Sequence, residues 1–142
     1  MATLQTIRDA AVSVLNDIVG LSQSTLSFHK ENIPATVVDN TFFVTMGSIE
    51  KNETTRADAS AGLCSNKERT LIVRVVIDDA SHTEQDYEDL IYLEETIEDN
   101  LLTDSRTAPY LDTLVDVKTE PDSGNAYWLL EMIFSLEYQR TF

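Results

Sequence analysis

The sequence of 142 residues contains few of the residue types on which common functional motifs depend. Cys64 is the single cysteine, which excludes an internal disulfide and fits a reducing compartment. One cysteine and two histidines are too few ligands for a structural zinc site. The four glycines stand apart from one another, so neither a phosphate-binding loop nor a dinucleotide-binding fingerprint is present. These absences exclude disulfide scaffolds, zinc modules and the common nucleotide-binding loops.

Long apolar runs are lacking as well. No run approaches the ~20 residues that a helix needs to cross a bilayer. The first residues carry no basic region followed by an apolar core, so we expect no signal peptide. The length suits one domain with a sizeable core, and neither an internal repeat nor a linker interrupts it. We therefore expect a single domain over residues 1–142, with no membrane contact.

Positive charge is scarce: ten basic residues stand against 25 acidic ones, for a formal net charge of −15. Eleven acidic residues and no lysine or arginine lie between Asp78 and Asp104. Nucleic-acid affinity comes mainly from Lys and Arg contacts to phosphates, so this composition disfavours a DNA-binding module. Two explanations stay open for the acidic segment. It is a solvated helix face, or a surface that DNA slides past without sticking.

The segment from residue 127 to the last residue has the clearest pattern in the chain. Its apolar row occupies alternate positions, as in a β-strand: Trp128, Leu130, Met132, Phe134, Leu136 and Tyr138. The opposite row begins apolar with Tyr127, Leu129 and Ile133 and ends polar. The pattern predicts a long strand with a core on one face and partial apolar cover on the other.

The remaining periodicities predict an α+β fold with about four mostly antiparallel strands and two amphipathic helices packed on one sheet face. The expected helices cover residues 3–19 and 83–102, and the expected strands cover 41–46, 69–79, 113–120 and 127–142. The predicted helical core stripes are Leu4, Ile7, Ala11, Val14, Leu15 and Ile18, then Tyr87, Leu90, Ile91, Ile97, Leu101 and Leu102.

Residues 48–68 are polar and show no period, which predicts a long loop between the first and second strands. Loops of this length in a compact domain are usually functional or disordered. Lys51, Arg56 and Lys67 lie in this segment and Arg69 follows it directly. Both a mobile hairpin tip and a binding arm that orders on a partner remain open interpretations.

One cluster suits a divalent cation. Asp78, Asp79 and His82 fall together at a strand-to-helix junction, and carboxylates with imidazole are ligands for such ions. Capping of the helix end and solvation are the ordinary roles of these residues in such a place. We expect no metal and no cofactor.

Two further groupings of residues bear on catalysis. Cys64 with His29 or His82 would make a nucleophile and base, but no activating pattern surrounds the thiol. The carboxylates of the acidic helix would allow acid–base pairing, but a hydrated outer face is the favoured explanation of these residues: Glu94, Glu95, Glu98 and Asp99. We expect no catalytic residue and no enzyme.

The order of elements resembles the tail terminator proteins of tailed bacteriophages. The resemblance is carried by the strand Leu71-Ile72-Val73-Arg74-Val75-Val76-Ile77, the helix from residue 87 to 102, and the closing segment 133–139. It implies a virion protein, assembled in the host cytoplasm, that forms a ring of usually six subunits. Such a ring caps the tail tube, stops its polymerisation and joins it to the head connector. DNA passes through the lumen without specific binding.

The resemblance leaves alternatives. A head-completion or neck adaptor protein bound to the portal is the nearest one, and a small metal-dependent enzyme or ligand-binding module is another. The number of subunits, six or twelve, also stays open. The long segment 48–68 departs from the family plan, so contacts made there cannot be transferred from relatives.

Assembly in a closed ring requires two different surfaces on each subunit. Partial apolar cover on the second face of the last strand makes Tyr127, Leu129 and Ile133 candidates for contact with a neighbour or with the tube. Basic residues in and beside the long loop are the second candidate group: Lys51, Arg56, Lys67 and Arg69.

Overall fold

The computed structural model describes residues 3–24, 40–47, 51–58, 62–78, 84–121 and 127–141. For 51–58, 62–67, 77–78, 86–87, 120–121, 127–128 and 139–141 it describes the backbone alone. The interpretations of the Asp78, Asp79 and His82 cluster and of Cys64 with His29 rest on side chains outside this description.

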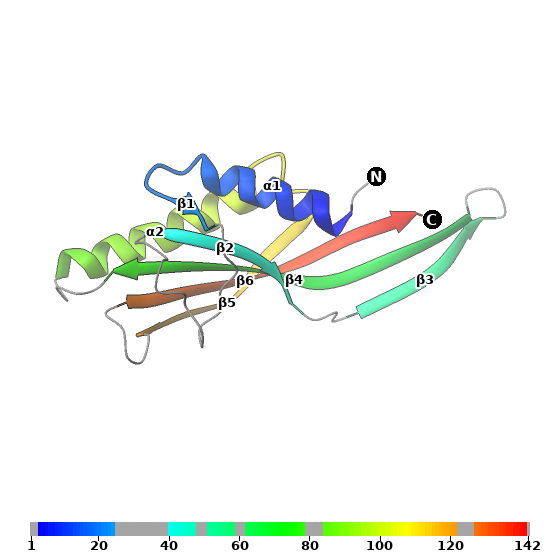
Figure 1. Ribbon diagram of the computed structural model, residues 1–142. Helices are drawn as coiled ribbons and strands as arrows, with labels where there is room; N and C mark the ends of the chain where they lie inside the picture. The colour runs from blue at the N-terminus through cyan, green and yellow to red at the C-terminus, as the bar shows by residue number, and fades with distance from the viewer. Residues whose placement is uncertain are drawn as a thin grey trace.

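The described chain forms one sheet with two helices on one of its faces (Figure 1). The elements are α1 (Leu4–Asn16), β1 (Ser22–Gln23), β2 (Thr41–Met46), β3 (Lys51–Asp58), β4 (Gly62–Asp78), α2 (Glu84–Thr103), β5 (Leu111–Pro121) and β6 (Tyr127–Thr141). The strand order is β1-β2-β4-β6-β5, and β3 also pairs with β4. All pairs are antiparallel except β1 with β2. The α+β class is confirmed, with six strands in the described part instead of about four.

Helix α1 begins at a reciprocal cap. The Thr3 hydroxyl accepts a hydrogen bond from the Thr6 backbone N–H at 3.2 Å, and the Thr6 hydroxyl accepts one from the Thr3 N–H at 2.9 Å. The helix ends at Asn16, three residues before the predicted end, and Gly20 follows in a turn with φ of +94°. Its buried residues come from the predicted stripe: Ile7, Ala11, Val14 and Leu15.

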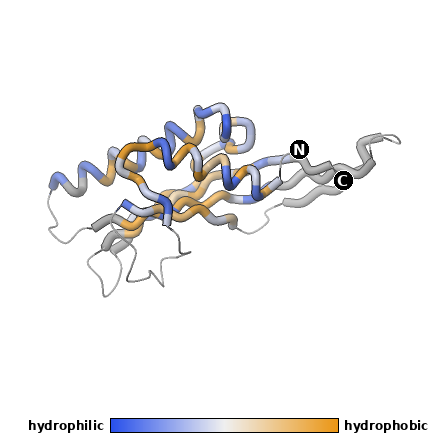
Figure 2. Tube along the Cα trace, turned by 45° about the horizontal axis from the view of Figure 1, so that its top comes forward, coloured by the Kyte–Doolittle hydropathy of each residue, from blue (hydrophilic) through white to orange (hydrophobic). Residues whose placement is uncertain are grey.

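The core lies between the sheet and the helices, where Figure 2 shows apolar residues on the inner sides of the elements. In β6 the predicted alternation is confirmed over the described side chains, because Leu130, Met132, Phe134, Leu136 and Tyr138 are all buried. In α2 the buried residues are Leu90, Ile97 and Leu101. Ile91 was predicted in this stripe but is 40% exposed, since it lies about 100° around the helix from Leu90.

The prediction of a long loop at residues 48–68 is wrong. Most of this segment is β3 and the first part of β4, paired from Lys51 opposite Glu68 to Asp58 opposite Gly62. β4 also pairs with β6 along nearly its whole length, from Cys64 opposite Thr141 to Asp78 opposite Tyr127. We call β3, residues 62–69 of β4 and residues 137–141 of β6 the arm, which extends past the helices in Figure 1. Its sequence has no apolar alternation, so period analysis misses strands that are specified by backbone pairing.

A candidate assembly surface

Gly47 lies at the base of the arm, directly after the end of β2 and before the start of β3. The Gly47 N–H donates to the Thr70 carbonyl at 2.8 Å. The Arg69 guanidinium donates to the Gly47 carbonyl from Nη2 at 2.7 Å and from Nε at 3.2 Å. A Cβ on residue 47 would overlap Thr70 Oγ1, so the close approach requires glycine. Of the candidate basic residues, Arg69 therefore braces the base of the arm from a partly buried position.

The arm differs from the rest of the chain in charge. Its strands carry five basic residues, Lys51, Arg56, Lys67, Arg69 and Arg140, and four acidic ones, Glu53, Asp58, Glu68 and Glu137. The arm therefore has a formal charge of +1. The remainder holds the other five basic and 21 acidic residues, for −16. Half of the cations in the chain are thus gathered on one projecting element.

The second face of the sheet, opposite the helices, offers less apolar surface than predicted. Leu129 is only 2% exposed, so the chain itself already covers it. Ile133 is partly exposed and pairs in register with the partly exposed Ile72. The Tyr127 side chain lies outside the described part. Of the three candidates on this strand, Ile133 is the one shown to have surface left for a partner.

An ion pair crosses the same face. Arg74 Nε lies 2.8 Å from Glu131 Oε2, and the two side chains are 15% and 12% exposed. Arg74 and Glu131 are direct register partners on β4 and β6. Removal of either member of this mostly buried pair would destabilise the fold, because the remaining charge would be left partly desolvated. The pair thus fixes the register of the two long strands.

One outer edge of the sheet is closed. Arg8 reaches from α1 to β2, beyond the two positions at which β2 pairs with β1, and donates from Nε to the Val44 carbonyl at 2.8 Å. Its guanidinium carbon lies 5.3 Å from the centre of the Phe43 ring, within range of a cation–π contact. Covering an edge carbonyl in this way disfavours the addition of another strand there.

The outer face of α2 is acidic with an apolar centre. The helix contains eight acidic residues and no basic one. Tyr92 is 72% exposed, Ile91 is 40% exposed, and the exposed carboxylates around them are Glu88, Asp89, Glu95 and Asp99. Among the described residues, no ion pair reaches a carboxylate of α2. The sequence predicted the acidic face but not the exposed position of Tyr92. The signal that could have identified this position is an aromatic residue outside the predicted core stripe of the helix.

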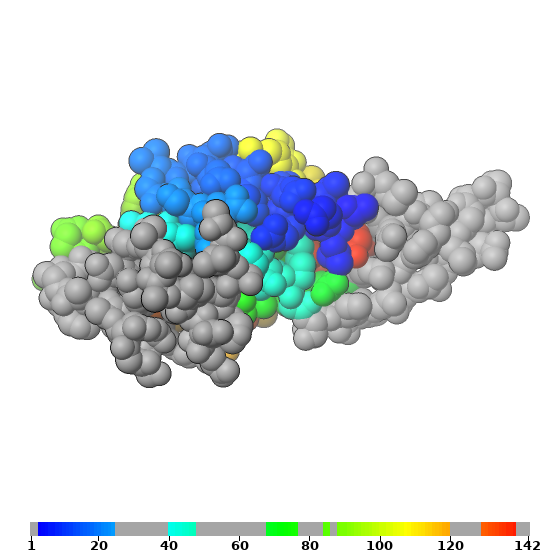
Figure 3. Space-filling model, viewed as in Figure 1, coloured from blue at the N-terminus to red at the C-terminus, as the bar shows by residue number. Residues whose placement is uncertain are grey.

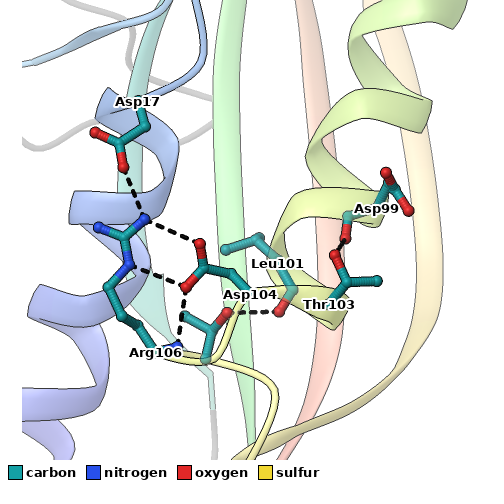
Figure 4. A network of polar contacts seen from close by, with 7 residues as sticks. Asp17, Asp99, Leu101, Thr103, Asp104 and Arg106 are labelled. Carbon is teal, nitrogen blue, oxygen red and sulfur yellow. Dashed lines mark hydrogen bonds and ion pairs between the residues drawn. The ribbon is translucent and has the colours of Figure 1, made fainter.

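A polar network holds the helix ends together (Figure 4). Arg106 Nη2 lies 2.7 Å from Asp17 Oδ2 at the end of α1 and 2.9 Å from Asp104 Oδ2. Hydrogen bonds from the Arg106 side chain and then from its backbone N–H lower the pKa of Asp104 to about 2. The same contacts, first with Asp104 and then with Asp17, raise the pKa of Arg106. The Thr107 hydroxyl, buried nearby, donates to the Leu101 carbonyl at 2.6 Å.

Comparison with known proteins gives a likeness to solved structures. The sequence matches no known protein family and no curated protein. Among solved structures, a chain from the "virion of native gene transfer agent (GTA) particle" aligns with a TM-score of 0.57 and 12% sequence identity. The alignment covers 98% of both chains. The two chains share a fold. At this identity the likeness concerns the fold alone, but it extends over the arm and over the rest of the chain, which we call the body.

The described side chains show surfaces suited to contact and no cluster suited to metal chemistry. No group of three His, Cys, Asp or Glu residues within the described part is arranged to hold a metal ion. In that same part, neither helix combines the length and apolarity needed to cross a bilayer. Figure 3 shows the side of α1, where β2 lies below this helix and a part of β6 lies beside the start of the helix.

Proposed function

We propose that this protein is a virion structural protein of the tail terminator type. It forms a ring, in our proposal a hexamer, that caps the tail tube, stops tube polymerisation and joins the tube to the head connector. The observation that carries the proposal is the fold shared over 98% of both chains with a component of a gene transfer agent virion. Its place is then the tail or neck of the particle, and it has no enzymatic role.

The surfaces of the subunit support a ring. A closed ring of head-to-tail contacts uses two dissimilar surfaces on each subunit. This chain has a projecting, slightly basic arm and a strongly acidic body. Lys51, Arg56 and Lys67 on the arm and Ile133 on the second sheet face remain our candidates for contacts with a neighbour or with the tube. A net charge of −15 per subunit also suits a lumen through which DNA passes without binding.

Light scattering combined with negative-stain imaging tests the proposal directly. Six chains of 15.9 kDa would give a particle of roughly 95 kDa with a central opening. Assembly that occurs only on purified tail tubes, with tube growth halted, supports the proposal equally. A protein that stays monomeric with and without tubes, and never halts their growth, would contradict it.

The same experiment separates the nearest alternative. Parallel mixtures with purified tail tube protein and with purified portal protein report which partner is bound. Binding to tubes and not to portal supports the terminator role. Binding to portal alone would assign the chain to head completion, and the terminator role would then be abandoned.

A further inference from the structure

Two complementary surfaces of this chain lie at opposite ends of the molecule. In Figure 1 the arm projects beyond one end of the body, whereas α2 begins at the other end. One chain therefore cannot bring its own arm onto its own α2. Contact between these two surfaces requires a second copy, placed head to tail with the first.

The outer face of α2 has the composition of a contact surface. Ile91 and Tyr92 are two of the four large hydrophobic residues that are exposed among the described side chains. They lie on a helix that is otherwise acidic on its exposed side, with Glu88 and Glu95 one turn to either side of Tyr92. An exposed aromatic residue ringed by charge is typical of the centre and rim of a protein–protein interface.

The arm complements this face in charge and in length. In the arm as defined, five basic residues stand against four acidic ones, whereas the remainder of the chain carries a formal charge of −16. The exposed row of α2 from Gln85 to Asp99 is roughly 21 Å long at the rise of an α-helix. Residues 62–69 of β4 extend over roughly 23 Å at the rise of a β-strand. Each surface is thus long enough to cover the other.

We propose that the arm of one subunit lies along the outer face of α2 of the next subunit and that this contact closes the ring. The occupant of the α2 face is a second copy of this chain. The inference rests on the proposed ring, and it specifies which surfaces form each junction. Arg56 and Lys67 lie on the same face of the arm and supply its charge, and Tyr92 is the apolar centre on α2. Arg69 is not included, because it braces Gly47 within its own subunit.

Charge reversal on each side tests the junction. The α2 variant combines Glu88→Lys with Glu95→Lys, and the arm variant combines Arg56→Glu with Lys67→Glu. A matched control, Asp9→Lys with Asp112→Lys, makes the same charge change as the α2 variant at exposed positions away from α2. Circular dichroism establishes that each variant is folded, and light scattering measures its assembly.

We expect each variant alone to stay monomeric, and the control to form rings like the unaltered chain. Mixing the two variants in equal amounts should restore rings of alternating copies. In such a ring every junction again joins opposite charges, acidic arm to basic α2 or basic arm to acidic α2. Rings formed by the α2 variant alone, or folded variants whose mixture does not assemble, would overturn the inference.

A second variant avoids charge effects. Tyr92 is largely exposed, so Tyr92→Ala leaves the core untouched and should weaken self-association by about tenfold or more, as loss of an interface anchor does. Undiminished assembly of Tyr92→Ala would count against the junction. If the unaltered chain forms no ring either alone or on purified tail tubes, the proposed function fails instead. If α2 variants form rings but no longer cap tubes, the α2 face binds the tube and the inference is wrong.

Discussion

Arg106 links the ends of the two helices through ion pairs between partly exposed side chains. Its side chain is 40% exposed, and that of Asp17 is 68% exposed. Exposed ion pairs contribute little individually, because solvent screens them and the side chains lose freedom. Here one guanidinium engages two carboxylates with several hydrogen bonds, and that geometry favours a defined orientation of α1 against the turn before β5.

The pKa of Asp104 predicts how this link responds to acid. A carboxyl whose pKa falls from 3.8 to about 2 on folding adds stability above pH 4, and that stability is lost as the pH drops through about 2. We expect Asp104→Asn to melt at a lower temperature than the unaltered chain at pH 6. The difference should have nearly vanished at pH 2. Thermal melts at both pH values measure it.

Asp112→Asn is the matched control for that comparison, because Asp112 is exposed and outside the Arg106 network. Its melting temperature should differ little from that of the unaltered chain at either pH. An Asp104→Asn effect of equal size at pH 6 and pH 2 would show that the side chain acts through something other than its charge.

Gly47 is the second residue with a measurable role. A Cβ there would overlap Thr70 Oγ1 and lie 3.3 Å from Thr70 Cβ. We expect Gly47→Ala to lower the free energy of unfolding by about 1–3 kcal/mol, as overpacking does. Chemical denaturation measures the change. Adding Thr70→Ala removes the overlapping hydroxyl and should recover most of the loss, and a double variant as unstable as the sum of the singles would contradict this cause.

At the scale of elements, β4 and β6 each serve two purposes along their length. In the body, β4 supplies Leu71, Val73 and Val75 to the core, opposite Phe134, Met132 and Leu130 of β6. In the arm the same two strands continue with a polar sequence and with β3 alongside. The change from a core-facing to a polar sequence occurs at Gly47 and Arg69. The structure therefore predicts that the body can fold without the arm.

Replacement of the arm hairpin tests this separation. Gly47 and Thr70 already face each other through a hydrogen bond, so an Asn-Gly pair in place of residues 48–69 should close a two-residue hairpin. We expect a folded monomer with a cooperative thermal transition that forms no rings, measured by circular dichroism and light scattering. An unfolded product would show that the body needs the arm, and normal rings would show that assembly does not.

At the scale of the whole molecule, charge opposes assembly. Each subunit carries −15, and repulsion between subunits acts over a Debye length of about 30 Å at 10 mM salt but only about 8 Å at 150 mM. Contacts at an interface are screened less than this long-range repulsion. We therefore expect the protein concentration needed for ring formation to decrease as NaCl is raised from 10 to 150 mM. Light scattering across a dilution series measures this concentration.

Sucrose at matched osmolarity is the control, because it changes hydration without screening charge, and it should not reproduce the full effect. Assembly that weakens steadily as NaCl rises from 10 mM would contradict the prediction. It would mean that attraction at the junctions outweighs the repulsion between whole subunits.

The sequence by itself determined the parts of the fold in which one face meets the core. Strand β2 matches its predicted range of 41–46, and both helices end within three residues of their predicted ends. The buried row of β6 also follows directly from its alternation. These features are local, because a helix or strand with one buried face must repeat its apolar residues at the period of its backbone.

Only the tertiary structure determined that residues 51–58 and 62–69 form an arm, that Leu129 is buried and that Tyr92 is exposed. The arm is specified by pairing between residues far apart in the chain, such as Cys64 with Thr141, and a polar ribbon has no period to reveal it. Whether an apolar side chain such as Leu129 is covered depends on what packs against it, which local sequence does not encode. The same holds for the candidate junction, because distant segments place the basic residues and the acidic helix at opposite ends of one molecule.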